Sequence, residues 1–306
     1  MLSCVRSYRF LHVDVFTDHL FGGNQLAVFP DGRGLSSETM QAVAKEMNFS
    51  ETTFVLPSEQ VGTDMRVRIF TPGSELPMAG HPTIGTTFAL ARAGVIAPAR
   101  ERIVFGLGIG PTPVTMTWSD RELDFAWMTQ AAPVFGEPVS DRACAAAALG
   151  LPDTALADFP VQVVSCGLPY VLVPLATRKA VDRAVLSVSA YDRLVRVAGG
   201  DANGVFLFST ERAQDGATAY SRMFAPAVGV FEDPATGSAS GPLGCYLVRH
   251  QMVPAGSAGA MLSLQGVKMG RPSDVHISIG VDGGDIRSVR VGGSSVLAGE
   301  GTLYIP

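Results

Sequence analysis

The sequence contains few cysteines, and no two of them are close enough to form a metal or redox motif. Its 306 residues include four cysteines, and none lies two to four residues from another. Zinc ribbons and thioredoxin-type sites need such closely spaced pairs, and disulfide frameworks are typical of small cysteine-rich secreted domains. No histidine pair has the helical spacing of metal ligands either. We therefore expect no metal site and no disulfide-stabilised fold. The cysteines are Cys4, Cys144, Cys166 and Cys245.

Charged residues are scarce, and basic residues are not clustered. The 23 Lys and Arg residues are outnumbered by 28 Asp and Glu, giving a net charge of -5, and no run of five basic residues occurs. A nucleic-acid partner is therefore not expected, since such binding normally needs a basic patch.

Long apolar runs are missing as well. A transmembrane helix needs about 20 apolar residues, but the longest stretch, residues 161–176, is interrupted by Pro169 and Pro174. Arg6 and Arg9 interrupt any signal-peptide core near the N-terminus. We expect a soluble cytoplasmic protein without a membrane segment.

Strand patterns dominate what is present. Residues 10–16, 65–69 and 275–279 alternate between apolar and polar, which is typical of strands with one buried face. Helical patterns are fewer. One helix is expected after Ser36 or Ser37, one from Pro82 to Arg92, and one from Thr236 to His250. The last two are apolar on nearly every side, which indicates buried helices. Further strands are expected at 112–118, 122–128, 161–165, 170–175, 204–209, 218–225 and 286–291.

A short motif occurs twice, each time before one of the two buried helices. Residues 68–72 read RIFTP and residues 222–226 read RMFAP. Two copies of strand, loop and buried helix indicate two similar lobes. We therefore predict an α+β fold in which each lobe is a β-barrel-like sheet wrapped around a central buried helix. The lobes are expected to comprise residues 1–130 and 131–306, with the last strand able to pack back on the N-terminal lobe.

The glycine-rich turns before these helices are candidate ligand sites. Gly80 opens one turn, and Gly237 and Ser238 end the other. A helix N-terminus has unpaired N–H groups and a partial positive charge, so it can bind an anion without Lys or Arg. The alternative is that small residues there only allow close helix packing.

Three ionisable residues flank these features. His81 follows Gly80 and could act as a ligand or acid/base group. Asp233 precedes the second turn and could bind substrate or cap the helix. Glu51 has Phe49, Phe54 and Val55 around it in the sequence, and a carboxyl group partly buried by apolar residues suits proton transfer near neutral pH. The alternative for Glu51 is an ordinary exposed loop position.

Common cofactor and nucleophile motifs are absent. The sequence contains no P-loop pattern, and the glycines at 106–110 lead into a strand and lack the spacing of a dinucleotide fingerprint. The stretch at 237–241 has Ala239 where a nucleophile elbow needs serine. We expect no cofactor.

Five ordered motifs resemble PhzF-like proteins of phenazine biosynthesis along essentially the whole chain. They are FTDHLFGGNQLAV at 16–28, NFSETTF at 48–54, RIFTPGSELPMAGHPTIG at 68–85, SRMFAPAVGVFEDPATGSASGPL at 221–243 and LQGVKMGRPS at 264–273. The resemblance implies a fold like that of diaminopimelate epimerase, with the active site between two lobes. Epimerases of that fold use two cysteines at the glycine-rich turns, and this chain has none there.

The same resemblance implies roles for individual residues. Glu51 is the implied acid/base, His81 and Asp233 are implied to contact substrate in the catalytic site, and Ser238 is implied to hold substrate with the backbone N–H groups of Gly80 and Gly237. The family's phenazine enzyme isomerises trans-2,3-dihydro-3-hydroxyanthranilate by moving a proton from C3 to C1, and the resulting enol tautomerises to a ketone.

These implications lead to one main hypothesis and two alternatives. The main hypothesis is a cofactor-independent isomerase of that small anionic carboxylate, acting as a homodimer. The alternatives are an isomerase or epimerase of another small carboxylate, and a binding protein that has lost catalysis. Glu51 argues against the last, because a binding-only protein has no need of a carboxylate facing an anionic ligand. Gln25 stands where family members commonly have proline; that position is expected to lie outside the site.

Overall fold

The structure is a computed structural model that describes residues 5–305. Cys4 lies outside this range. The chain divides into two compact units: unit 1 comprises residues up to Met128 together with residues from Gly292 onward, and unit 2 comprises Thr129–Val291. The chain leaves unit 1 within strand β8 (Glu122–Gln130) and returns within strand β17 (Asp285–Gly293).

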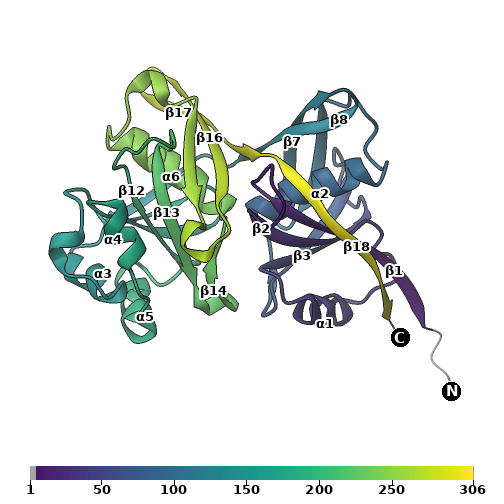
Figure 1. The fold of residues 1–306 in the computed structure, drawn as a ribbon, viewed down its shortest axis with the longest axis horizontal. Coiled ribbons are helices and arrows are strands. Elements are labelled where there is room, and N and C mark those ends of the chain that lie inside the picture. Colours follow the sequence, from purple (N-terminus) through teal and green to yellow (C-terminus); the bar gives the residue numbers. More distant parts are fainter. Residues whose placement is uncertain (1–4, 306) are drawn as a thin grey trace. The chain divides into compact units, whose positions relative to one another are not determined.

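Unit 1 contains a mixed sheet. Strand β1 pairs antiparallel with both β18 and β2, β2 pairs parallel with β3, and β3 pairs antiparallel with β4. Strand β4 then pairs antiparallel with β5 and parallel with β6, followed by the antiparallel neighbours β7 and β8. Figure 1 shows β18 alongside β1. The bounds are β1 (Arg6–Val15), β2 (Asn24–Phe29), β3 (Glu51–Pro57), β4 (Met65–Phe70), β5 (Glu75–Leu76), β6 (Arg102–Leu107), β7 (Gly110–Ser119) and β18 (Ser295–Ile305).

Unit 2 repeats this order of pairing. Strand β10 pairs antiparallel with β9 and β11, β11 pairs parallel with β12, and β12 pairs antiparallel with β13. Strand β13 then pairs antiparallel with β14 and parallel with β15, and β15 pairs antiparallel with β16. Strands β9 to β16 thus correspond in order to β18 and β1 to β7. The bounds are β9 (Val134–Pro138), β10 (Gln162–Ser165), β11 (Pro169–Pro174), β12 (Val205–Ser209), β13 (Ala219–Ala225), β14 (Val230–Asp233), β15 (Met261–Gln265) and β16 (Ser273–Asp282).

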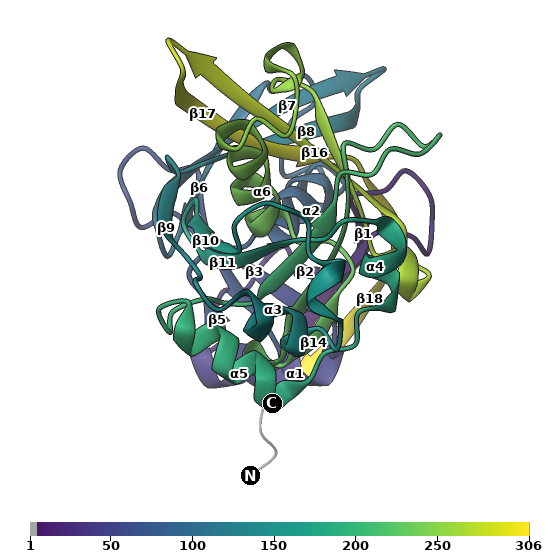
Figure 2. The ribbon, with the colours of Figure 1, turned by 90° about the vertical axis from the view of Figure 1, so that its left-hand side faces the viewer.

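One buried helix occupies the same place in the order of each unit. Helix α2 (Gly80–Arg92) follows β5, and helix α6 (Gly237–Arg249) follows β14. Residues 80–90 and 237–247 are all buried, which confirms the prediction of helices covered on every side. Helix α2 contacts β1, β2, β3 and β18, while α6 contacts β10, β11 and β16 (Figure 2).

Small residues allow these helices to approach the strands closely. A Cβ atom on Gly85 of α2 would lie 2.6 Å from Cγ2 of Val15, and one on Gly244 of α6 would lie 2.4 Å from Cγ2 of Ile277. Buried hydroxyl groups are satisfied within the helices, because Thr83 donates to the carbonyl of Ala79 and Ser240 donates to that of Thr236. The alternative considered for the small residues, that they allow close helix packing, therefore holds at Gly85 and Gly244.

The predicted helix starts are close to the observed ones. Helix α1 (Ser37–Met47) begins after Ser36, whose hydroxyl accepts from the N–H of Thr39, so the predicted N-cap is confirmed. Helix α2 begins two residues before Pro82. Helix α6 begins at Gly237, with Thr236 as its N-cap residue. The interpretation of Asp233 as the cap is wrong, because Asp233 is the last residue of β14.

Three helices of unit 2 were not predicted. They are α3 (Arg142–Ala148), α4 (Arg178–Arg183) and α5 (Val188–Val197), and Figure 2 shows α3 and α5 side by side. Helix α3 is rich in alanine, the best helix former, and the side chain of Asp141 caps it. Helices α3 and α4 are too short to show a clear 3.6-residue period. No helix within residues 5–305 has the length and apolar character needed to span a bilayer.

Candidate functional site

Glu51 is the first residue of β3 and is only 8% exposed. Side chains alternate along a strand, so Glu51, Thr53 and Val55 share one face. That face points toward α2, because the hydroxyl groups of Thr53 and Thr86 lie 2.8 Å apart. Phe54 lies on the opposite face, in a cluster with residues of α1. The expectation that Phe54 surrounds Glu51 was therefore wrong, and the alternative of an exposed loop residue is also excluded.

His81 lies beside Glu51. Nε2 of His81 is 3.2 Å from Oε2 of Glu51, although this close contact is not aligned as a hydrogen bond. On the other side of the ring, Nδ1 of His81 is 3.1 Å from Nδ2 of the Asn24 side chain. Burial lowers the pKa of His81 to about 3, and a hydrogen bond with the backbone of Gln25 opposes this shift. The imidazole is therefore neutral at pH 7, with one nitrogen able to donate and the other able to accept.

Asn24 and Gln25 reach His81 because the preceding loop is tightly folded. The buried carboxylate of Asp14 accepts from the N–H of Phe21, and Gly23 has a φ of +62°. A Cβ atom on Gly23 would lie 2.3 Å from the carbonyl oxygen of Val15, so only glycine fits there. Gln25 is not among the predicted site residues, although its backbone forms a hydrogen bond with the imidazole of His81.

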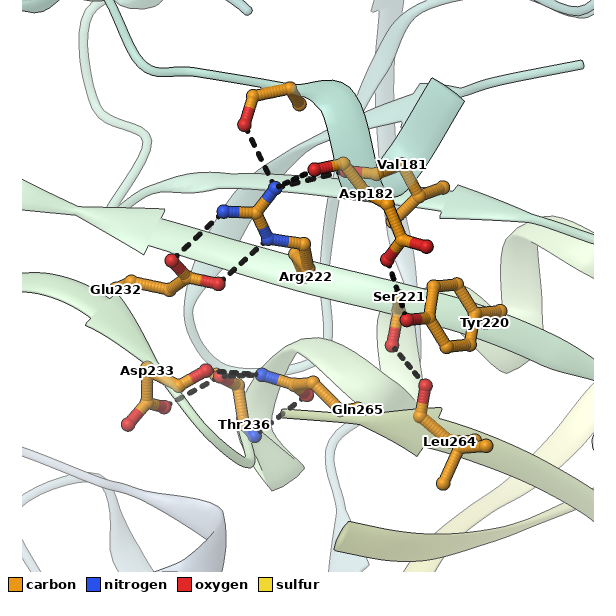
Figure 3. A network of polar contacts seen from close by, with 11 residues as sticks. Val181, Asp182, Tyr220, Ser221, Arg222, Glu232, Asp233, Thr236, Leu264 and Gln265 are labelled. Atoms are coloured by element: carbon orange, nitrogen blue, oxygen red, sulfur yellow. Dashed lines mark hydrogen bonds and ion pairs between the residues drawn. The ribbon is translucent and has the colours of Figure 1, made fainter. Parts of the chain in front are cut away.

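In unit 2, Gln265 holds the turn between β14 and α6 (Figure 3). This side chain is fully buried; its Oε1 accepts from the N–H of Thr236, and its Nε2 donates to the carbonyl of Asp233. The hydroxyl of Thr236 donates to the Asp233 carboxylate at 2.6 Å. Asp233 is itself 7% exposed, and its carboxylate has this partner within the turn.

The first turn of α6 carries the predicted residues Gly237 and Ser238. Ser238 is 4% exposed, and its Oγ lies 2.7 Å from the hydroxyl of Tyr170 on β11. Gln130 donates to the carbonyl of Gly237 at 2.9 Å. Among residues 5–305 the structure records no acceptor for the backbone N–H groups of Gly237 and Ser238. These donors, with the helix dipole behind them, suit a carboxylate.

The repeated motif forms the same ion pair in both units. Arg68 makes a two-pronged contact with Glu75, at 2.7 and 2.6 Å, and Arg222 makes one with Glu232, at 2.7 and 2.9 Å. Each glutamate stands five residues before the first residue of the buried helix. Arg222 is nearly buried and also donates to the carbonyls of Val181 and Ala184 (Figure 3). The arginine therefore fixes the strand that leads into each glycine-rich turn.

Each unit thus brings together its own share of the predicted residues. Glu51, Gly80 and His81 meet in unit 1, and Asp233, Gly237 and Ser238 meet in unit 2. Sequence analysis missed Asn24, Tyr170 and Gln265. Asn24 and Gln265 stand within motifs that were recognised, whereas nothing in the local sequence marks Tyr170. No group of three or more His, Cys, Asp or Glu side chains in the described part of the chain could hold a metal ion.

Comparison with known proteins decides the family. The model of the phenazine biosynthesis-like (PhzC-PhzF) proteins matches residues 13–301. The chain belongs to this family. A trans-2,3-dihydro-3-hydroxyanthranilate isomerase of Pseudomonas aeruginosa is 38% identical to it, over 97% of the chain and 100% of the relative. An uncharacterized isomerase of Mesorhizobium japonicum is 34% identical, over 98% and 100%.

A solved structure supports the same assignment for the fold. The phenazine biosynthesis protein of the PhzF family from Bacillus anthracis is 26% identical and superposes with a TM-score of 0.85, covering 98% of this chain and 100% of that one. This chain is an isomerase, as its relatives in the PhzF family are.

Proposed function

We propose that the chain is a cofactor-independent isomerase that converts trans-2,3-dihydro-3-hydroxyanthranilate by proton transfer through Glu51. The observation that carries the proposal is the buried carboxylate of Glu51, 3.2 Å from a neutral imidazole. A neutral neighbour does not pair the carboxyl group of Glu51 with a cation, which suits a base that must also return its proton. The 38% identical relative that carries this activity in its name supports the substrate.

In the proposed reaction, Glu51 takes the proton from C3 of the substrate, and a proton is returned at C1. The bonding electrons shift along the conjugated system, so the product is an isomer and no electrons leave or enter the molecule. The resulting enol then tautomerises to the ketone. His81 contacts the substrate and orients it beside the carboxylate. We propose that Gly80, Gly237, Ser238 and Asp233 hold the substrate through their backbone N–H groups and side chains.

The test is to incubate the purified protein with this substrate, without added metal or nucleotide, and to follow the product by NMR. We expect conversion by the wild type and none by Glu51→Gln. Absence of conversion by the wild type would refute the proposed substrate. A second candidate, isomerisation of another small carboxylate, is favoured by the relatives named as uncharacterized isomerases, at 34% and 31% identity. Genes of phenazine biosynthesis next to this gene would favour the first candidate.

We also propose that the protein acts as a homodimer. This rests on the family resemblance alone, since the sequence has no heptad repeat or other interface signature. Light scattering coupled to size-exclusion chromatography at micromolar concentration should give about twice the 32.1 kDa mass of the chain. A mass of one chain would refute the homodimer.

A further inference from the structure

The repeat identifies which residue of unit 2 occupies the place of Glu51. In unit 1, Phe70 of the repeated motif pairs with Thr52, the residue after Glu51. In unit 2, the corresponding Phe224 pairs with Val205, the residue after Gly204. Gly204 thus stands where unit 1 has its carboxylate.

No larger side chain fits at Gly204. A Cβ atom there would lie 2.3 Å from the terminal methyl of Met223 and 2.7 Å from the carbonyl oxygen of Phe224. The repeat therefore supplies one carboxylate only, in unit 1, and the equivalent position of unit 2 can carry no acid/base group.

In unit 1 the side chain in the first turn of the buried helix contacts a glutamate, whereas in unit 2 it contacts a tyrosine. Ser238 follows Gly237 as His81 follows Gly80, so the two side chains hold equivalent places in the first turns of α6 and α2. His81 contacts Glu51 on β3, whereas Ser238 contacts Tyr170 on β11. Strand β11 is the neighbour of β12, which corresponds to β3. Both Tyr170 and Ser238 are 4% exposed, so little water competes for their contact.

The 2.7 Å contact between the two hydroxyl groups allows either of them to be the donor. A phenol is more acidic than an alcohol and is therefore the better donor, which favours the arrangement in which the Tyr170 hydroxyl donates to Oγ of Ser238. The serine proton is then left to donate elsewhere. A charged carboxylate is the strongest acceptor it could meet, and the two adjacent backbone N–H groups favour the same ligand.

We infer that Tyr170 is a positioning residue of the substrate site: by donating to Ser238, it fixes the serine hydroxyl as a donor to the substrate carboxylate. The inference rests on the proposed function in so far as Ser238 holds the substrate. It adds a residue that the resemblance does not assign and a reason why a carboxylate is preferred to a neutral group of the same shape.

The experiment compares Tyr170→Phe with Tyr246→Phe, which is a matched control. The hydroxyl of Tyr246 also makes one short hydrogen bond in unit 2, to the carbonyl of Pro160 at 2.6 Å, but it is not placed in the site. Calorimetry measures the Kd of each variant for anthranilate and for 2-aminobenzamide, in which a neutral amide replaces the carboxylate. Steady-state kinetics with the proposed substrate gives KM and kcat separately.

For Tyr170→Phe we expect anthranilate to bind roughly 5- to 30-fold more weakly, as the loss of one oriented hydrogen bond to a charged group would cause. The Kd for 2-aminobenzamide should change less, KM should rise, and kcat should stay within about 3-fold, because Glu51 is untouched. In a Ser238→Ala background the effect of Tyr170→Phe should vanish. The Tyr246→Phe protein should bind both ligands as the wild type does.

Equal anthranilate affinities for Tyr170→Phe and Tyr246→Phe would overturn the inference while leaving the proposed function standing. So would an equal loss for anthranilate and 2-aminobenzamide, which indicates a structural role only. Failure of the wild type to bind anthranilate would overturn it as well. Carboxylate binding that depends on Tyr170, together with no turnover of the dihydrohydroxyanthranilate, would instead uphold the inference and refute the proposed substrate.

Discussion

Nε2 of His81 lies 3.2 Å from Oε2 of Glu51, and both side chains are buried in unit 1. Because burial lowers the pKa of His81 to about 3, the imidazole is neutral at pH 7 and the contact is not a salt bridge. A charged imidazole would stabilise the carboxylate and weaken it as a base. The contact therefore favours a catalytic carboxylate whose proton affinity is not reduced by a neighbouring cation.

Glu51→Gln should abolish turnover and preserve ligand binding. The amide keeps the shape of the carboxylate and removes the proton acceptor, so a loss of about 10²–10⁴-fold in kcat is expected. The measurement is kcat for the proposed substrate and the Kd of the variant for anthranilate. Near-normal kcat would contradict the assignment of Glu51. Glu46, an exposed residue of α1, provides the control Glu46→Gln, which should leave both values unchanged.

Turnover in D₂O should place deuterium partly at the reprotonated carbon. While Glu51 carries the abstracted proton it can exchange with water, whereas exclusion of water would retain more of the original hydrogen. Substrate deuterated at C3 should show a primary isotope effect if proton abstraction limits the rate. Mass spectrometry and NMR of the product measure both. Transfer without exchange, or deuterium only at the carbon of the keto tautomerisation, would favour a direct shift within the substrate and a positioning role for Glu51.

The free energy of unfolding should rise with pH between about 3 and 6.5. In the folded protein His81 stays neutral down to a pKa of about 3, whereas in the unfolded chain it takes up a proton near its ordinary value of 6.5. Between these values the unfolded state binds more protons, so acid favours unfolding. Urea unfolding at several pH values should show a shallower dependence for His81→Asn than for the wild type. His19, which is exposed, supplies the control His19→Asn; an equal slope in His81→Asn and the wild type would contradict the prediction.

Activity should survive thiol alkylation and chelators. Cys144, Cys166 and Cys245 are buried, and Sγ of Cys166 lies 3.8 Å from that of Cys245. This contact and burial raise the pKa of Cys166, and burial raises that of Cys144, so little reactive thiolate forms. Mass spectrometry of a Cys4→Ser protein treated with iodoacetamide should find little label before unfolding and full label after it. Loss of activity in proportion to label at Cys166 or Cys245 would contradict this.

Arg222→Met should destabilise the protein more than Arg68→Met. The Arg222 and Glu232 side chains are 8% and 16% exposed, whereas Glu75, the partner of Arg68, is 41% exposed and can be hydrated when its partner is lost. Breaking the buried pair should cost about 3–5 kcal/mol, and breaking the more exposed one about 1 kcal/mol. Midpoints of urea unfolding compare the two variants. A larger shift of the midpoint for Arg68→Met would contradict the prediction that burial of the ion pair decides how much stability is lost.

Sequence alone determined many of the strands, the two buried helices and the family, because each leaves a local or ordered pattern, whereas strands such as β2, β6 and β15 were not predicted. Alternation marked β4 and β16, apolar residues on every side marked α2 and α6, and the RIFTP and RMFAP motifs marked the positions of Arg68 and Arg222. Helices α3 and α4 were not predicted because helices of seven and six residues leave little periodicity, and their stability comes from tertiary packing. Helix α5 is amphipathic, so its pattern was present in the sequence and was missed.

Only the tertiary structure decided how the site residues meet. Glu51 and His81 are 30 positions apart, and Tyr170 and Ser238 are 68 apart, so no local pattern could relate the members of either pair. Alternation along β3 places Glu51 and Thr53 on the same face of the strand. The sequence of the strand does not specify whether α2 covers that face or the opposite one. The lowered pKa of His81 likewise follows from burial by segments distant in the chain, since desolvation depends on everything packed around the ring.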